Sequence, residues 1–272
     1  AVGFVLSGFS LAGFMYGVEI LSKDGVSYFY SLLIIGFSLL LLWFNVRYSK
    51  HISHPLIDYS VMKINSYKVT ILTGSVSRMI IGVFPYLVPL MFQEGFGLNP
   101  FESGLLFLST MVGNLSMKSL TVWIMHRFRF RTILIVNGCF SALFTFFTAL
   151  LMPTTPVYVI VLVLFTAGLF RSLQFSSLTT LAFTDTPASQ TTAANTLYST
   201  IQQMSTGMGI AMGAVVLRFS NIINHGIAGH YTIPDFRLAF IFVTVLGFVH
   251  LYGYTKLSKD AGSVVMLKKK MF

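Results

Sequence analysis

Apolar residues occur in eight long runs, and each run is about as long as the roughly 20 residues that a helix needs to cross a bilayer. The runs cover residues 2–20, 28–46, 68–92, 101–125, 132–152, 157–181, 193–217 and 236–256. Helices are expected because lipid offers no partner to an unpaired backbone group. The alternating ten-residue segments of a membrane barrel are absent from the sequence. The pattern therefore predicts an all-α polytopic membrane protein with eight transmembrane helices.

Composition supports this class of protein. Of 272 residues, 55% are hydrophobic and 10% are charged, and the mean hydropathy is +0.78, whereas about a quarter of the residues of a soluble domain are charged. The net charge of +10 does not indicate nucleic acid, because most Lys and Arg residues lie between the apolar runs. The single cysteine, Cys139, cannot form a disulfide within the chain.

The basic segments predict an orientation. Lys and Arg concentrate in 47–67, in 126–131 and in the tail 257–272, which eight spans place on one face of the membrane. The positive-inside rule then puts both ends of this chain in the cytoplasm. Segment 182–192 lies on the same face without any Lys or Arg.

The same segments predict the domain organisation. Two linker helices (1–46) precede a cytoplasmic linker (47–67), a six-helix unit (68–256) and the basic tail. The chain begins at Ala1 inside an apolar run, so we interpret it as a piece of a longer protein.

Three cations interrupt apolar runs: Arg78, Lys118 and Arg171. A charge at the centre of a membrane helix costs about 2.5–3.5 kcal/mol and usually faces the bundle interior or a water-filled cavity. Asn114 shares a helix face with Lys118, and Gln174 shares one with Arg171, because residues three or four apart are neighbours. The alternative is that the long side chains snorkel to the interface, which is most plausible for Lys118.

Run 193–217 adds a polar stripe that includes Gln202, with Gln203 beside it. We predict that these glutamines, Asn114, Gln174 and the three cations line one substrate-binding cavity. Helix-to-helix hydrogen bonding is the alternative for such amides. No Asp or Glu lies inside the six later runs, away from their ends. The cations therefore need either a carboxylate from outside this chain or an anionic substrate.

Other features are structural. Gly209 and Gly213 have the spacing that lets two membrane helices approach closely. Pro85 and Pro89 permit a kink in run 68–92. The turn sequences 94–100 and 152–156 predict antiparallel hairpins between the runs that flank them. The sequence contains no phosphate-binding glycine loop, no metal-ligand spacing and no catalytic constellation, so we expect a protein that is not an enzyme and needs no cofactor.

Three stretches together resemble a known family. They are "HPLIDYSVMKINSY" (54–67), "RMIIGVFPYLVPLMFQEGFGLNPFESGLLFL" (78–108) and "NTLYSTIQQMSTGMGIAMGAVVL" (195–217). The second contains a Pro-Leu element, a glutamine, a glycine turn and a Ser-Gly-Leu element in the order typical of the fourteen-helix drug:proton antiporter branch of the major facilitator superfamily. The likeness extends over essentially the whole chain.

This resemblance implies an integral protein of the plasma (bacterial inner) membrane, with an alternating-access fold whose site lies between two six-helix bundles. The chain would then provide the two extra helices and the C-terminal bundle, and would lack the N-terminal bundle. The loop "MHRFRFRTIL" (125–134) is similar to the family's gating loop, where Arg127 and Arg131 are kept. His126 and Arg129 replace the acid and the glycine expected there.

Two hypotheses of function follow. The first is the C-terminal portion of a transporter that exports small molecules, drugs or organic anions, with the proton gradient as its driving force. The second is a non-transporting half-protein that packs against a partner transporter half. Both imply lipid as the surrounding partner and no role for nucleic acid.

Overall fold

The computed structural model describes residues 2–21, 28–49, 59–225 and 230–263, and contains no strand within them. Its helices are α1 (Val2–Leu21), α2 (Tyr28–Ser49), α3 (Asn65–Leu90), α4 (Pro100–Arg127), α5 (Phe130–Ala149), α6 (Val157–Thr184), α7 (Thr191–His225), α8 (Ile233–Val249) and α9 (Leu251–Tyr254). Short turns of other helix types are η1 (Tyr59–Lys63), η2 (Met91–Gly95) and η3 (Ala188–Gln190). Residues 50–58 of the predicted linker and 264–272 of the predicted basic tail lie outside the described residues.

Six described segments are long and apolar enough to cross a membrane: Asn65–Gly95, Pro100–Arg127, Phe130–Ala149, Val157–Thr184, Ala188–His225 and Ile233–Tyr254. They correspond to the last six apolar runs of the sequence. The two leading runs also form helices, α1 and α2, but neither is among the six. In α2 the apolar stretch is the shorter Phe29–Asn45. The structure thus supports six of the eight predicted membrane helices.

The end of α7 and the start of α8 differ from the sequence prediction. Helix α7 continues to His225, well beyond residue 217, and α8 begins before Asp235 rather than after it. Asp235 is fully buried, with 0% of its surface exposed. Its carboxylate accepts hydrogen bonds from Asn221 at 2.9 Å and Asn224 at 2.6 Å, and forms a capping box with Thr232. These partners explain why α7 is longer and why α8 starts earlier than predicted. A buried carboxylate needs hydrogen-bond donors, and the asparagines at the end of α7 and Thr232 at the start of α8 provide them.

Helix α3 runs through Pro85 and Pro89 and ends in the π-helical turn η2. Proline cannot donate the helical hydrogen bond at its own position, so the ladder loosens there. The carbonyl of Pro89 accepts a hydrogen bond from the Ser103 hydroxyl of α4 at 3.0 Å. This bond ties the end of α3 to the start of α4.

The turn between α3 and α4 has the predicted chemistry. Gly97 adopts a left-handed φ of 72°, a conformation that glycine adopts without a steric penalty. Asn99 and Glu102 then form a capping box that starts α4.

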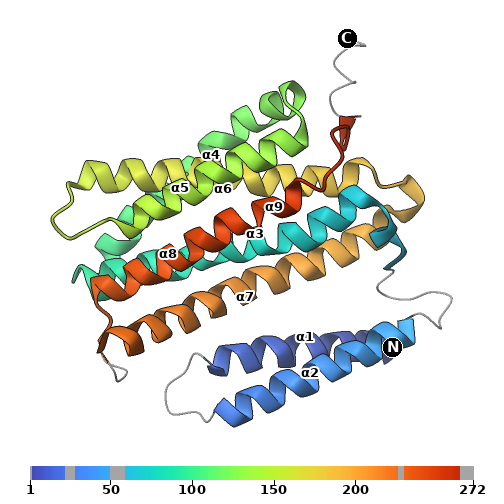
Figure 1. The fold of residues 1–272 in the computed structure, drawn as a ribbon, viewed down its shortest axis with the longest axis horizontal. Coiled ribbons are helices and arrows are strands. Elements are labelled where there is room, and N and C mark those ends of the chain that lie inside the picture. Colours follow the sequence, from blue (N-terminus) through green and yellow to red (C-terminus); the bar gives the residue numbers. More distant parts are fainter. Residues whose placement is uncertain (1, 22–27, 50–58, 226–229, 264–272) are drawn as a thin grey trace.

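Packing between the helices is not the simple hairpin order that the turns predicted. Helix α4 packs chiefly on α6 rather than on its neighbour α3, and α3 pairs with α7. Helix α5 lies against both α6 and α8, as the second predicted hairpin requires. In Figure 1, α1 and α2 form a separate pair that runs alongside α7.

Glycines set the closest of these contacts. A Cβ on Gly113 of α4 would overlap the Phe165 carbonyl of α6, and one on Gly168 of α6 would overlap the Thr110 carbonyl of α4. Gly209 of α7 lies in the same way against the backbone of Met79 in α3. The backbones of these two helix pairs therefore touch directly, as small residues allow in membrane bundles.

Candidate substrate-binding groove

A polar groove of about 440 Å³ lies between α4 and α6. Its lining comprises Asn114, Lys118, Ser172, Phe175, Ser176, Thr179 and Thr180. The five residues from α6 follow a spacing of three and four, so they form one face of that helix. This surface is called the α4–α6 groove below.

Asn114 and Lys118, two of the predicted substrate-binding residues, lie together in the groove. Ser172 donates from its hydroxyl to the Asn114 backbone carbonyl at 2.8 Å and also lies 3.1 Å from the Asn114 Oδ1 atom. These contacts hold Asn114 in place across the helix crossing. The Lys118 side chain is exposed and makes no hydrogen bond or ion pair with a described residue. It therefore brings a positive charge to a surface otherwise lined by amide, hydroxyl and phenyl groups.

Arg78, from α3, is buried beneath this groove rather than exposed in it. Only 1% of its surface is accessible. Its guanidinium carbon lies 4.6 Å from the ring centre of Tyr198 in α7, a cation–π distance. The Tyr198 hydroxyl is 2.8 Å from the Thr179 hydroxyl, which lines the groove. Arg78 thus supports the groove through one intervening aromatic residue.

The Arg78 guanidinium is poorly satisfied in this site. Its Nη1 atom donates to the Thr70 carbonyl at 3.3 Å, while Nε and Nη2 have no hydrogen-bond partner. A guanidinium offers five N–H donors. Burial of a charge with so few partners is costly.

Arg171 points away from the groove, into the interface between α6, α3 and α5. It is 4% exposed, its guanidinium lies over the ring of Phe84, and its Nη2 atom donates to the Thr145 hydroxyl at 3.1 Å. Its Nε and Nη1 atoms have no hydrogen-bond partner. Neither buried arginine pairs with a carboxylate in the described part of the chain.

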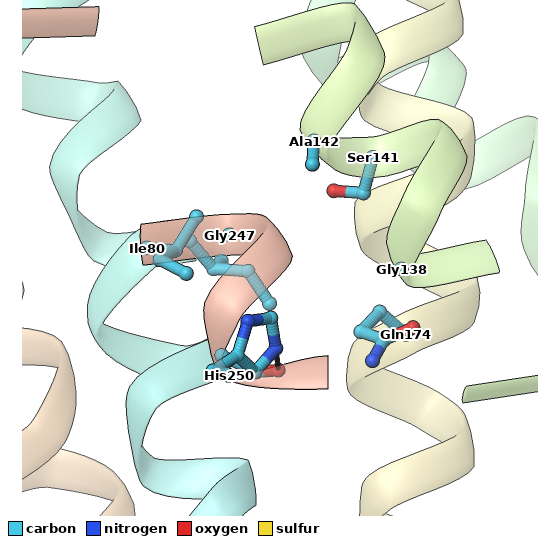
Figure 2. Close-up of a pocket in the computed structure, with 9 residues that line it drawn as sticks. Ile80, Gly138, Ser141, Ala142, Gln174, Gly247 and His250 are labelled. Carbon is cyan, nitrogen blue, oxygen red and sulfur yellow. Dashed lines mark hydrogen bonds between the residues drawn. The ribbon is translucent and has the colours of Figure 1, made fainter. Parts of the chain in front are cut away.

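Gln174 bridges two helices. It is 3% exposed, and its Oε1 atom accepts from the Asn137 side chain of α5 at 2.8 Å. Asn137 also donates to the Phe170 carbonyl at 2.8 Å. This is the helix-to-helix hydrogen bonding that the sequence left open as an alternative for the membrane amides. Gln174 also faces a second, much smaller cavity (Figure 2).

The remaining sequence-predicted residues are not in the groove. Gln202 is half-buried and Gln203 is exposed, both on α7, which contributes no residue to the groove lining. Arg127 is exposed and Arg131 is half-buried at the turn between α4 and α5, and neither is ion-paired within the described residues. The glycine Gly213 faces the side chains of Val83 and Tyr86 on α3.

Sequence reasoning missed the hydroxyl groups of α6, namely Ser172, Ser176, Thr179 and Thr180. Their spacing on one helix face was the available signal. It is a weak signal, because membrane Ser and Thr residues often bond their own helix, as Thr179 does to the Phe175 carbonyl at 2.9 Å. No group of His, Cys, Asp and Glu residues suited to a metal ion occurs in the part of the chain that the structure describes.

Comparison with known proteins gives the family. A family model described as Major Facilitator Superfamily matches residues 1–212. Among relatives, a "Putative multidrug resistance protein MdtD" of Pectobacterium carotovorum is 29% identical over 189 residues, which cover 69% of this chain and 40% of the relative. The protein of that name from Escherichia coli O6:H1 is 29% identical over 225 residues, covering 79% of this chain and 46% of the relative.

The chain thus spans less than half the length of the relatives that it matches. The matched family region includes α1 to α6 and the groove, and the apolar helices are those of an integral membrane transporter family. The chain belongs to the major facilitator superfamily.

Proposed function

We propose that this chain is the C-terminal portion of a proton-coupled transporter that exports small molecules by alternating access. In that arrangement α3 to α9 form one six-helix bundle, α1 and α2 are the two additional membrane helices, and the rest of the protein supplies the other bundle. The names of the relatives, which include multidrug resistance, support export as the direction of transport.

The α4–α6 groove is the proposed contribution of this bundle to the substrate site. The observation that supports it is the unpaired, exposed Lys118 beside Asn114 in a cavity of about 440 Å³ lined with hydroxyl groups. Polar groups that converge in a concave surface are typical of small-molecule sites. Arg78 is proposed as a positioning residue, since it contacts Tyr198 rather than the groove itself. A cation without a carboxylate partner favours substrates that contain an anionic group.

Lys118 provides the test. The full-length protein would be reconstituted in proteoliposomes, and transport of carboxyfluorescein, an anion, would be compared with transport of ethidium, a cation. A hydrogen bond to a charged group is worth about 1.5–3 kcal/mol, so Lys118→Ala should weaken the apparent affinity for carboxyfluorescein about 10- to 100-fold. Ethidium transport should not weaken.

Two variants serve as controls. Lys118→Arg keeps the charge and should retain most of the affinity, and Lys259→Ala removes an exposed lysine that lies away from the groove. Equal behaviour of Lys118→Ala and the wild-type protein toward both dyes would rule out the groove as an anion site.

A further inference from the structure

A second, buried polar cluster lies inside the bundle, between α3, α5, α6 and α8. It surrounds a cavity of about 20 Å³, which is room for about one water molecule. Ser77, Ser141, Gln174 and His250 supply the polar groups of its lining. Figure 2 shows the His250 ring and the Gln174 amide facing each other across this space.

His250 is held by hydrogen bonds at both ring nitrogens. Its Nδ1 atom lies 3.2 Å from the Leu246 carbonyl, and its Nε2 atom lies 2.7 Å from the Ser77 hydroxyl. A carbonyl oxygen can only accept, so Nδ1 bears the hydrogen in the neutral ring and Nε2 accepts from Ser77. The Ser77 oxygen in turn accepts from the Tyr254 hydroxyl, 2.7 Å away. When His250 is neutral, each group therefore donates to the next in one direction, from Tyr254 to Ser77, from Ser77 to His250 and from His250 to the Leu246 carbonyl.

Adding a proton at Nε2 would reverse this chain. Both ring nitrogens would then donate, so Ser77 would accept from His250 and donate to the Tyr254 oxygen. The Tyr254 hydroxyl would then have to turn away from Ser77, toward the Gln174 side chain with which it already interacts. The protonated ring itself would donate at both nitrogens, to Leu246 and to Ser77.

The groups that face this cluster carry little compensating charge. They are Ser77 and Arg78 on α3, Ser141 on α5, Gln174 on α6, Tyr198 on α7 and Tyr254 on α9. Arg78 is the charged one among them, and no described carboxylate is part of the cluster. A protonated His250 would therefore place a second positive charge in a region that already contains a buried arginine.

We propose that His250 is a proton-binding site of this transporter, an inference that rests on the proton coupling proposed above. Imidazole is suited to this role because it can take up a proton at Nε2 while both of its nitrogens keep a hydrogen-bond partner. Asp235, the fully buried acid of the same helical segment, already accepts from several donors at the helix start.

A continuous series of contacts connects His250 to the groove. His250 bonds Ser77, which precedes Arg78, whose guanidinium lies on Tyr198, whose hydroxyl bonds Thr179 of the groove. A change in the His250–Ser77 bond on protonation would act at the residue next to Arg78 in this series. Proton binding and substrate binding can therefore influence each other across α3 and α7.

The test uses the full-length protein in proteoliposomes, with carboxyfluorescein as the transported probe. Two modes are compared: exchange at equal pH, and accumulation driven by a gradient of one pH unit, which corresponds to about tenfold in a concentration ratio. His250→Gln should keep exchange within about twofold of wild type but lose the gradient-driven accumulation. His230→Gln, at an exposed position, should behave as wild type in both modes.

The outcomes separate the two proposals. Full gradient-driven accumulation by His250→Gln would overturn the assignment of the proton site while leaving the transport function intact. A wild-type protein that exchanges the probe but ignores the pH gradient would refute proton coupling itself, and the His250 assignment with it.

If His250→Gln does not fold, Ser77→Ala replaces it. Ser77→Ala keeps the imidazole but removes its hydroxyl partner, and should shift the midpoint of the pH–transport profile; an unchanged midpoint contradicts the proposal.

Discussion

Arg78 is the residue whose placement is hardest to explain by stability alone. It is fully buried in α3, yet it makes one hydrogen bond, to a backbone carbonyl, and has no carboxylate partner among the described residues. Replacing a buried charge by an apolar group of similar volume is often neutral or stabilising. Its contact with Tyr198 beneath the groove instead suggests a functional reason for the charge.

Arg78→Met should therefore separate stability from activity. We expect the melting temperature of the detergent-purified, full-length protein to stay the same or rise, because a poorly satisfied charge is removed. Transport of carboxyfluorescein should fall at least about tenfold, a change of about 1.4 kcal/mol, because Tyr198 loses its cationic partner. Arg129→Met, at an exposed position in the α4–α5 turn, is the control. A clear drop in melting temperature for Arg78→Met would instead indicate a structural role.

At this scale the sequence identified the type of residue but not its surroundings. Arg78 and Arg171 were predicted to face the bundle interior or a cavity, and both are buried in the bundle. Their contacts with Tyr198 and Phe84 join different helices, and a single sequence does not reveal which helices meet. The same limit explains why Gln174 was grouped with the cations, although it pairs with Asn137 of α5.

At the scale of the helices, glycine decides which pairs come closest. Gly209 stands against the backbone of α3, so any side chain there would push α7 away. Gly104, on α4, has open space around the position of a Cβ atom. The two glycines form a matched pair for testing how much a close backbone contact contributes.

Opposite effects of the same substitution are expected at these two positions. Gly104→Ala should leave thermal stability unchanged or raise it, since glycine in a helix interior costs up to about 1 kcal/mol relative to alanine. Gly209→Ala should lower stability, because overpacking typically costs about 1–3 kcal/mol. Thermal unfolding of both variants, followed by tryptophan fluorescence or light scattering, measures the difference. Equal melting temperatures would mean that α7 adjusts without cost.

Helix positions were more predictable than helix partners. All six later apolar runs became helices within a few residues of the predicted ends, because length and hydropathy are local properties. The end of α7 was the exception. Its asparagines look like loop residues in the sequence, and only the folded chain brings them to Asp235. The pairing of α4 with α6 likewise depends on contacts between segments far apart in sequence.

At the scale of the whole molecule, the six membrane-crossing segments imply which turns share a side. Turns 128–129 and 185–190 and the region after Tyr254 lie at one end of the bundle, while turns 96–99 and 150–156 lie at the other. Basic residues lie around turn 128–129 and after Tyr254, so this end of the bundle is predicted to face the cytoplasm. The sidedness follows from charge distribution and is therefore open to a direct test.

Cysteine labelling in intact cells supplies that test. The exposed Cys139 would first be replaced by alanine. Single cysteines at Phe128 and Lys259 should then resist a membrane-impermeant maleimide until the cells are opened. Single cysteines at Glu94 and Thr154, which are both exposed, should react from outside. Labelling of Phe128→Cys from outside would reverse the predicted orientation.

The two backbone-to-backbone crossings have a mechanical consequence. Helices α4 and α6 touch through Gly113 and Gly168, and α3 and α7 touch through Gly209, so at these points no side chain that could yield separates the two backbones. Between the pairs, α6 meets α3 through the long side chain of Arg171 on Phe84. A contact between two side chains can adjust more easily than a contact between two backbones. When the bundle deforms, the α4–α6 and α3–α7 pairs are therefore expected to move relative to each other at such side-chain contacts, with the guanidinium sliding over the aromatic ring.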